Sequence, residues 1–230
     1  MTTDASSRPE SWFWAHDARP EHIASLVTPG VRLVRLSAYG AGPGRRFAAL
    51  VYGDGRADAG YELDLDGAAI PHAAAITVDD SGPAPLFSIV LDPAPGSNVH
   101  IDLDEAAATT LLAEHGGAAD IATYRTGGAR RYAIVLDGGS ATTLIADVTM
   151  DQLEERLRDV DAVPIRLRAH AGEPRFTAVA LRTDRDGWFW YADLDADQVA
   201  HELERHGSYP VDLDATRTAD GVRFTVVMRR

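Results

Sequence analysis

The sequence repeats one pattern of roughly 38 to 48 residues five times, and this internal repetition constrains the fold more than any other feature. The first copy opens with WFWAHD at 12–17 and the last with WFWYAD at 188–193. Three columns align in all five copies. They hold an aspartate (Asp17, Asp64, Asp102, Asp147, Asp193), an apolar residue three positions earlier (Trp14, Tyr61, Val99, Leu144, Trp190) and a later aromatic residue (Phe47, Phe87, Tyr132, Phe176, Phe224).

Each copy is predicted to form a strand, a helix and two further strands. The opening segment alternates its apolar side chains between two faces, which is typical of a strand. Helical pairs such as Ile23 with Val27 and Leu153 with Leu157 follow it. Pro71 limits the helix of the second copy to a turn or two. The remaining signals are the N-caps Asp66, Asp104, Thr149 and Asp195, the capping boxes Thr149–Gln152 and Asp195–Gln198, and the helix stops Gly30, Gly116 and Gly207.

The repeated columns also predict the roles of their residues. A residue type that recurs in every copy serves the unit, so the aligned aspartates are expected to accept backbone hydrogen bonds beside the helix start. The aligned aromatic residues, which open the last strand of each copy, are expected to be buried, so that truncating one to Ala would cost about 3–5 kcal/mol.

The copies are expected to form one domain of class α+β over residues 1–230. One unit cannot bury its apolar face alone, so neighbouring units must stack. Linear arrays carry polar capping repeats at their ends, whereas here the terminal copies are the most aromatic. This favours a closed or nearly closed, propeller-like ring in which the fifth unit packs on the first, with an open arc as the alternative. The repeats are expected at about 12–58, 59–96, 97–141, 142–187 and 188–230.

The WFWY opening, the helix ending in Gly, the VDL strand and the RFxxVM strand together resemble the bacterial tandem repeat domain. That module also forms the N-terminal region of polyglycine hydrolases, where it precedes a serine hydrolase domain of the β-lactamase type. Such a domain needs a Ser-x-x-Lys pair, and all 22 basic residues of this chain are Arg. The resemblance therefore implies the repeat fold and a role in substrate engagement or scaffolding, without the hydrolase activity.

Composition excludes several classes of function. The absence of Cys rules out thiolate chemistry and the absence of Lys rules out Schiff bases and P-loops. A net charge of −13 disfavours binding to nucleic acid or to anionic membranes. No signal peptide and no membrane-spanning run is visible, so a cytoplasmic protein is expected. The arginine-only usage with excess Ala and Asp indicates a high-GC bacterial source.

No metal or cofactor requirement is predicted. The stretch 193–204 has EF-hand-like acidic spacing, but Gln198 occupies the position where that loop needs Gly. A weaker calcium site at the Asp-x-Asp pairs is the alternative (Asp64/Asp66, Asp102/Asp104, Asp212/Asp214). The histidines lack the i, i+4 spacing of a helical zinc pair, and no G-x-S-x-G elbow is present.

Two sets of residues are candidates for ligand binding. Trp12 and Trp188 align with Ala59, Ser97 and Thr142, so their column does not require an apolar residue. The pair is expected either to close the ring as a hydrophobic seam or to form an aromatic platform. The second set lies at the turn between the last two strands, where variable residues of a repeat scaffold usually bind (Tyr39, Tyr124, His170 and Thr216).

These patterns favour a non-enzymatic binding or scaffold module, monomeric or homo-oligomeric, with a peptide, protein or carbohydrate partner. The first alternative is a hydrolase with a dispersed Ser/His/Asp site, and the second is a purely structural or oligomerising protein. A serine within hydrogen-bond reach of a histidine that is itself held by a carboxylate would favour the hydrolase.

Overall fold

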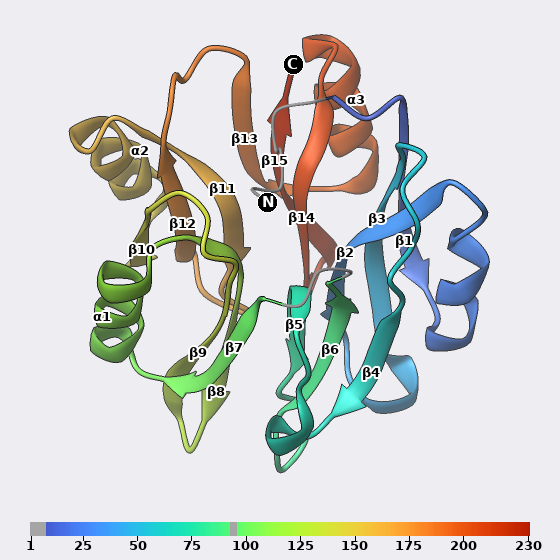
Figure 1. The fold of residues 1–230 in the computed structure, drawn as a ribbon, viewed down its shortest axis with the longest axis horizontal. Coiled ribbons are helices and arrows are strands. Elements are labelled where there is room, and N and C mark those ends of the chain that lie inside the picture. The colour runs from blue at the N-terminus through green and yellow to red at the C-terminus, as the bar shows by residue number, and fades with distance from the viewer. Residues whose placement is uncertain (1–7, 93–95) are drawn as a thin grey trace.

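The computed structural model describes residues 8–92 and 96–230, which form five three-stranded antiparallel sheets (Figure 1). Each sheet is built from one repeat of the sequence. In every sheet the third strand of the unit lies in the middle, between the first and the second. The repeated units inferred from the sequence are therefore confirmed, and the protein is mostly β with few helices.

The strands have equivalent places in all five units. The opening strands are β1 (Ser11–Ala18), β4 (Tyr61–Leu65), β7 (Asn98–Leu103), β10 (Thr142–Val148) and β13 (Trp188–Leu194). The second strands, called inner strands below, are β2 (Val31–Tyr39), β5 (Ala73–Asp79), β8 (Ala118–Thr126), β11 (Ala162–Ala169) and β14 (Tyr209–Thr218). The third, central strands are β3 (Arg46–Gly53), β6 (Leu86–Leu91), β9 (Ala129–Leu136), β12 (Phe176–Arg182) and β15 (Gly221–Arg229).

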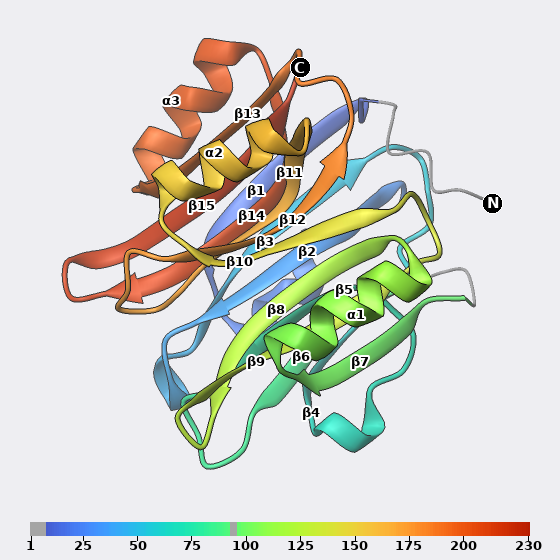
Figure 2. The same ribbon diagram turned by 90° about the vertical axis from the view of Figure 1, so that its left-hand side faces the viewer.

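Units three to five carry α-helices, which lie along the outer sides of their sheets (Figure 2). They are α1 (Glu105–His115), α2 (Met150–Asp159) and α3 (Ala196–His206). Their predicted N-caps accept backbone hydrogen bonds, both capping boxes form, and Gly207 ends α3 in the left-handed conformation. No helix in the described residues combines the length and the apolar character that a membrane crossing demands.

The first two units depart from this pattern. The α-helix predicted around Ile23 and Val27 is wrong, because the chain forms a 3₁₀-helix at Pro20–Leu26. The cap position of this unit is Arg19, which makes no side-chain cap hydrogen bond, and Pro29 disfavours helical backbone at Thr28. Gly30 therefore stops no α-helix. The second unit has a single 3₁₀ turn at Gly67–Ala69, as its proline predicted.

The aligned aspartates occupy a β-bulge rather than a helix cap. All five have positive φ, between 52° and 62°, and each lies where the pairing of the opening strand with the central strand shifts register. Asp tolerates the left-handed conformation better than most residues. The sequence prediction that these side chains accept local backbone hydrogen bonds is wrong, because their carboxylates face arginines.

Four of these aspartates pair with the arginine that precedes the aligned aromatic residue in their own unit. The N–O distances are 3.3 Å for Arg46–Asp17, 3.3 Å for Arg131–Asp102, 2.8 Å for Arg175–Asp147 and 3.6 Å for Arg223–Asp193. The second unit has Leu86 at the arginine position. There Arg45 of the first unit reaches across and donates from Nη2 to Asp64 at 2.8 Å, so the ion pair is kept by a neighbouring unit.

The left-handed bulge yields a stability prediction at Asp193, whose side chain is 82% exposed. Asp193→Val is expected to lower the free energy of unfolding by about 1–2 kcal/mol, because a β-branched residue is strained at φ 59°. Asp193→Gly removes the same carboxylate without the strain and is expected to change stability by less than about 0.5 kcal/mol. Urea unfolding of the two variants separates backbone strain from loss of the ion pair; equal destabilisation of both would contradict the backbone account.

Four of the five aligned aromatic residues are buried, namely Phe47, Phe87, Tyr132 and Phe224. Phe176 is only half-buried. Phe87 packs edge-on against Tyr124 of the following unit at 5.5 Å between ring centroids. The residue that corresponds to Tyr124 in the unit after Phe176 is Thr216, which has no ring to cover a neighbour.

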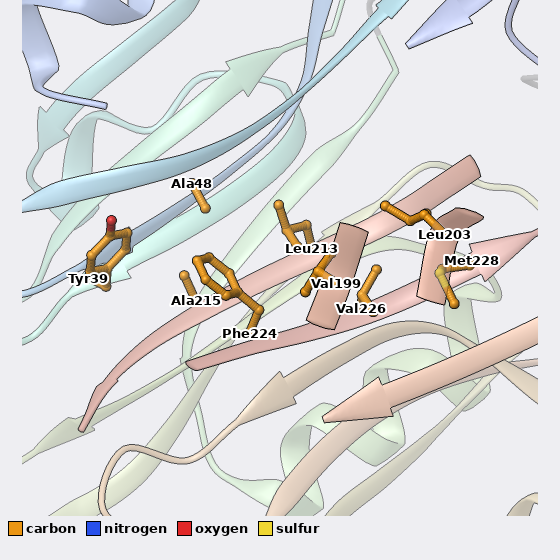
Figure 3. Packing of buried hydrophobic residues seen from close by; sticks show 9 residues of the cluster. All are labelled: Tyr39, Ala48, Val199, Leu203, Leu213, Ala215, Phe224, Val226 and Met228. Atoms are coloured by element: carbon orange, nitrogen blue, oxygen red, sulfur yellow. The ribbon is translucent and has the colours of Figure 1, made fainter. Parts of the chain in front are cut away.

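Adjacent units share their cores through the opening strands. In each buried cluster, side chains of one unit are joined by the opening strand of the next, for example Tyr61 and Leu63 on the first unit. The cluster of the fifth unit is joined in the same way by Trp12 and Trp14 of β1. It also contains Tyr39 and Ala48 of the first unit (Figure 3). The N-terminal and C-terminal units are thus in direct contact.

The inner strands also contact one another from unit to unit. Contacts join β2 with β5, β5 with β8, β8 with β11, β11 with β14, and β14 with β2. Between β14 and β2, the Ser37 hydroxyl donates to Asp214 at 2.8 Å, and the backbone N–H of Ala215 donates to the Ser37 hydroxyl at 2.9 Å. Tyr52 donates its hydroxyl to the Pro210 carbonyl at 2.6 Å.

Candidate functional site

A pocket lies where the C-terminal ends of all five inner strands come together, and we call it the central pocket. Its volume is about 500 Å³. It is lined by Leu36 and 38–40 of the first unit, 76–81 of the second, 122–125 and Arg130 of the third, 168–171 and Glu173 of the fourth, and 214–217 of the fifth. Because every unit contributes to it, the pocket depends on the assembly of the repeats rather than on one of them.

The pocket wall carries equal numbers of opposite charges. Its cations are Arg125, Arg130, Arg168 and Arg217, and its anions are Asp79, Asp80, Glu173 and Asp214. Glu173 already forms ion pairs with Arg125 and Arg130, and the distance to Arg130 is 2.9 Å. The site therefore presents a mixed polar surface with charged groups held in fixed positions.

A buried ion network lies next to the pocket. Arg168 donates to Asp212 at 2.6 Å and to Asp120 at 2.5 Å, and all three residues are buried. Arg35 and Arg166 flank these carboxylates at 3.7 and 3.5 Å. The network links residues of four units, so it fixes the relative positions of the inner strands.

The electrostatics of this network follow from burial and from close partners. Burial alone would lower the pKa of Arg168, but the Asp212 and Asp120 carboxylates raise it above its ordinary value, so the guanidinium stays charged. Burial raises the pKa of Asp120 against the opposing effect of Arg168. Burial likewise raises the pKa of Asp214 to about 6, while Arg168 and the hydrogen bond from Ser37 act in the opposite direction.

The predicted turn column does line the pocket, although its tyrosines have a structural role. Tyr39, Tyr124, His170 and Thr216 all belong to the lining. Tyr39 and Tyr124 are only 5% and 4% exposed. Their hydroxyls accept the backbone N–H groups of Asp17 at 2.9 Å and of Asp102 at 2.8 Å. The two tyrosines therefore provide hydrogen-bond acceptors for the backbone N–H groups of the bulges, and their buried side chains leave little surface for a ligand.

His170 is the most distinctive of the predicted residues. It is buried, its Nε2 lies 2.9 Å from the hydroxyl of Thr177, and its Nδ1 lies 3.4 Å from Oδ1 of Asp147. Burial, with a further contribution from Arg130, lowers the pKa of His170 to about 4. The imidazole is therefore neutral at physiological pH.

The structure does not bring Trp12 and Trp188 together, so the expected pairing of these indoles is wrong. Trp12 packs on the core of the fifth unit, and Trp188 packs on the core of the fourth. The reason is the packing rule of the repeat, in which each opening strand joins the preceding unit. Trp188 is also covered by the guanidinium of Arg229, 5.4 Å from its ring centroid.

In each Asp-x-Asp pair considered for calcium, the two carboxylates interact with different groups of the protein. Asp64 and Asp102 pair with arginines, whereas Asp66 and Asp104 cap helical turns. The carboxylates of Asp212 and Asp214 accept hydrogen bonds from Arg168, Ser37 and backbone N–H groups. Each pair thus directs its two carboxylates to different partners.

The geometry gives little support to the hydrolase alternative. Thr177, His170 and Asp147 follow one another at the distances given above, but Thr177 is completely buried and no substrate can reach its hydroxyl. A second pocket of about 400 Å³ holds Ser97 with His72, His100 and His115. The Ser97 hydroxyl has no hydrogen-bond partner in the described part of the chain, so no base is in place to activate it.

The fold and the central pocket define the class as a tandem-repeat protein of five sheet units that share one polar pocket. No protein-family profile matches the chain, and no significant match was found among curated proteins.

Proposed function

We propose that the five units close into a ring and that the protein is a non-enzymatic binding module whose ligand enters the central pocket. The contacts between β14 and β2 support closure, because they are of the same kind as the contacts between consecutive units. The observation that carries the function is the convergence of all five inner strands on one pocket. A volume of about 500 Å³ falls within the range of roughly 300–1,000 Å³ typical of ligand sites.

The chemistry of the lining favours a peptide over a carbohydrate. Sugars usually pack against an exposed aromatic face, and the tyrosines of this pocket are almost completely buried. The fixed arginines and carboxylates match the charged side chains and termini of a peptide. The net charge of −13 attracts cationic partners at long range, so the ligand is a peptide segment of mixed charge with a basic excess.

The resemblance to the bacterial tandem repeat domain agrees with this role, and we propose that the chain is a member of that family. Its WFWY opening and RFxxVM strand correspond to β13 and β15 in the structure. In polyglycine hydrolases the repeats accompany a hydrolase domain, which fits a module that engages peptide substrates without cleaving them.

Selection of displayed peptides on the immobilised protein tests the proposal. Peptides enriched on the wild-type protein are expected to bind Thr216→Trp at least tenfold more weakly, because the indole fills the pocket. Thr109→Trp places the same side chain on the exposed side of α1 and is expected to leave binding unchanged. Selection of no peptide, or equal binding by both variants, would favour a purely structural protein or a site elsewhere. A parallel glycan array tests the carbohydrate alternative.

A further inference from the structure

Three potential metal ligands meet at the edge of the central pocket. Asp147 comes from the end of β10, His170 follows β11, and Glu173 lies in the turn between β11 and β12. One ligand atom from each residue lies within 4.8 Å of the other two. His170 and Glu173 are close in the sequence, whereas Asp147 lies 23 positions (170 − 147) before His170. The fold of the fourth unit brings Asp147 to the other two residues.

His170 indicates that this cluster is more than a group of surface charges. Its side chain is only 1% exposed, and its buried Nδ1 has no hydrogen-bond partner among residues 8–92 and 96–230. The other ring nitrogen is held by Thr177 at 2.9 Å. A histidine that binds metal through one nitrogen usually has its second nitrogen oriented by an oxygen in this way. An unpartnered buried nitrogen that lies 3.4 Å from a carboxylate oxygen is therefore suited to share a cation with it.

The spacing agrees with tetrahedral coordination. Zinc bonds of about 2.0–2.1 Å at tetrahedral angles separate two ligand atoms by about 3.3 Å. Nδ1 of His170 lies 3.4 Å from Oδ1 of Asp147. A set of one nitrogen and two carboxylate oxygens favours zinc and similar transition ions over calcium and magnesium, which prefer sites made of oxygen alone.

We propose that Asp147, His170 and Glu173 bind one divalent transition-metal ion of the zinc type, with the remaining coordination position open toward the central pocket. Both carboxylates are ionised at neutral pH, since Arg175 lowers the pKa of Asp147 and Arg125 lowers the pKa of Glu173. The neutral imidazole of His170 supplies a free lone pair. This site is independent of whether the pocket also takes a peptide.

Neighbouring arginines compete with the ion and set its affinity. Arg175 donates to the same Oδ1 of Asp147 that faces His170, at 2.8 Å, and Arg130 and Arg125 hold Glu173. Binding therefore requires Arg175 to swing away, and its side chain is exposed enough to do so. Removing this competitor is expected to strengthen metal binding, which is an effect opposite to that of removing a ligand.

The test is titration of the metal-free protein with Co²⁺ by visible absorption and with Zn²⁺ by calorimetry. Wild-type protein is expected to bind one ion per chain, with the cobalt absorption bands of tetrahedral coordination. His170→Gln and Glu173→Gln are expected to weaken binding at least tenfold. Arg175→Gln is expected to tighten it at least threefold, and Arg182→Gln, which removes an exposed arginine of β12, is expected to have no effect.

Thermal melting of each variant without metal shows that it is folded, and Glu173→Gln at the exposed turn keeps the test valid even where His170→Gln loses stability. Absence of saturable binding to the wild-type protein would overturn the proposal. The proposal would also be overturned if folded Glu173→Gln bound the metal with wild-type affinity, or if Ca²⁺ competed for the site as well as Zn²⁺ does. A decrease in affinity in Arg175→Gln would contradict the competition described above.

Discussion

Replacing Arg168 by Met is expected to lower the free energy of unfolding by about 3–5 kcal/mol, since it leaves two buried carboxylates without their cation. Arg168 donates to Asp212 and Asp120 at 2.6 and 2.5 Å, and all three side chains are shielded from solvent. The remaining arginines, Arg35 and Arg166, are farther from the carboxylates and compensate only in part.

Urea unfolding measures this effect through the shift in midpoint at constant slope. Arg182→Met is the matched control, because Arg182 is exposed and, within the described part of the chain, donates only to the carbonyl of Val160. Its expected change is below about 0.5 kcal/mol. If Arg168→Met proved as mild as the control, the buried network would not be what fixes the inner strands.

The repeat and its local signals could be predicted from the sequence, because they depend on neighbouring residues. A cap residue and the helix it starts lie within four positions, so Asp104, Thr149 and Asp195 were sufficient to place their helices. The prediction of an α-helix failed in the first unit, where Arg19 stands at the cap position and makes no cap hydrogen bond. The aligned aspartates were found correctly but their role was not, since a left-handed bulge has no signal in sequence periodicity.

The site was predictable only in part. The turn column Tyr39, Tyr124, His170 and Thr216 does line the central pocket, because equivalent strands of a repeat end at equivalent places. The ion network was missed, since its residues come from three units: Arg168 is 48 positions from Asp120 and 44 positions from Asp212. The available signal was the presence of charged residues at alternate positions of otherwise apolar inner strands.

The pairing of Trp12 with Trp188 failed for a different reason. Similar residues at equivalent positions of a repeat occupy equivalent junctions, and these are two separate places rather than one. Trp12 and Trp14 lie between the fifth and first units, whereas Trp188 and Trp190 lie between the fourth and fifth. The two tryptophan pairs therefore provide a matched test of whether the chain closes into a ring.

Trp14→Ala is expected to destabilise the protein by about 3 kcal/mol, close to the cost of other large truncations at half-buried or buried sites. Trp14 packs edge-on against Phe224 of the fifth unit at 5.5 Å between ring centroids. Trp190 has the equivalent position on the fourth unit, where its Nε1 donates to Glu154 at 2.6 Å. The two variants remove the same side chain from the same column, at different junctions.

Native-state hydrogen exchange of these two variants tests the closed ring most directly, because it reports the opening of each unit separately. In Trp14→Ala, protection is predicted to fall in the first unit and also in β14 and β15 of the fifth unit, which begin 195 positions (209 − 14) after Trp14 in the sequence. In Trp190→Ala it is predicted to fall in the fourth and fifth units. Loss confined to the first unit in Trp14→Ala, with β14 and β15 as protected as in the wild-type protein, would contradict the ring.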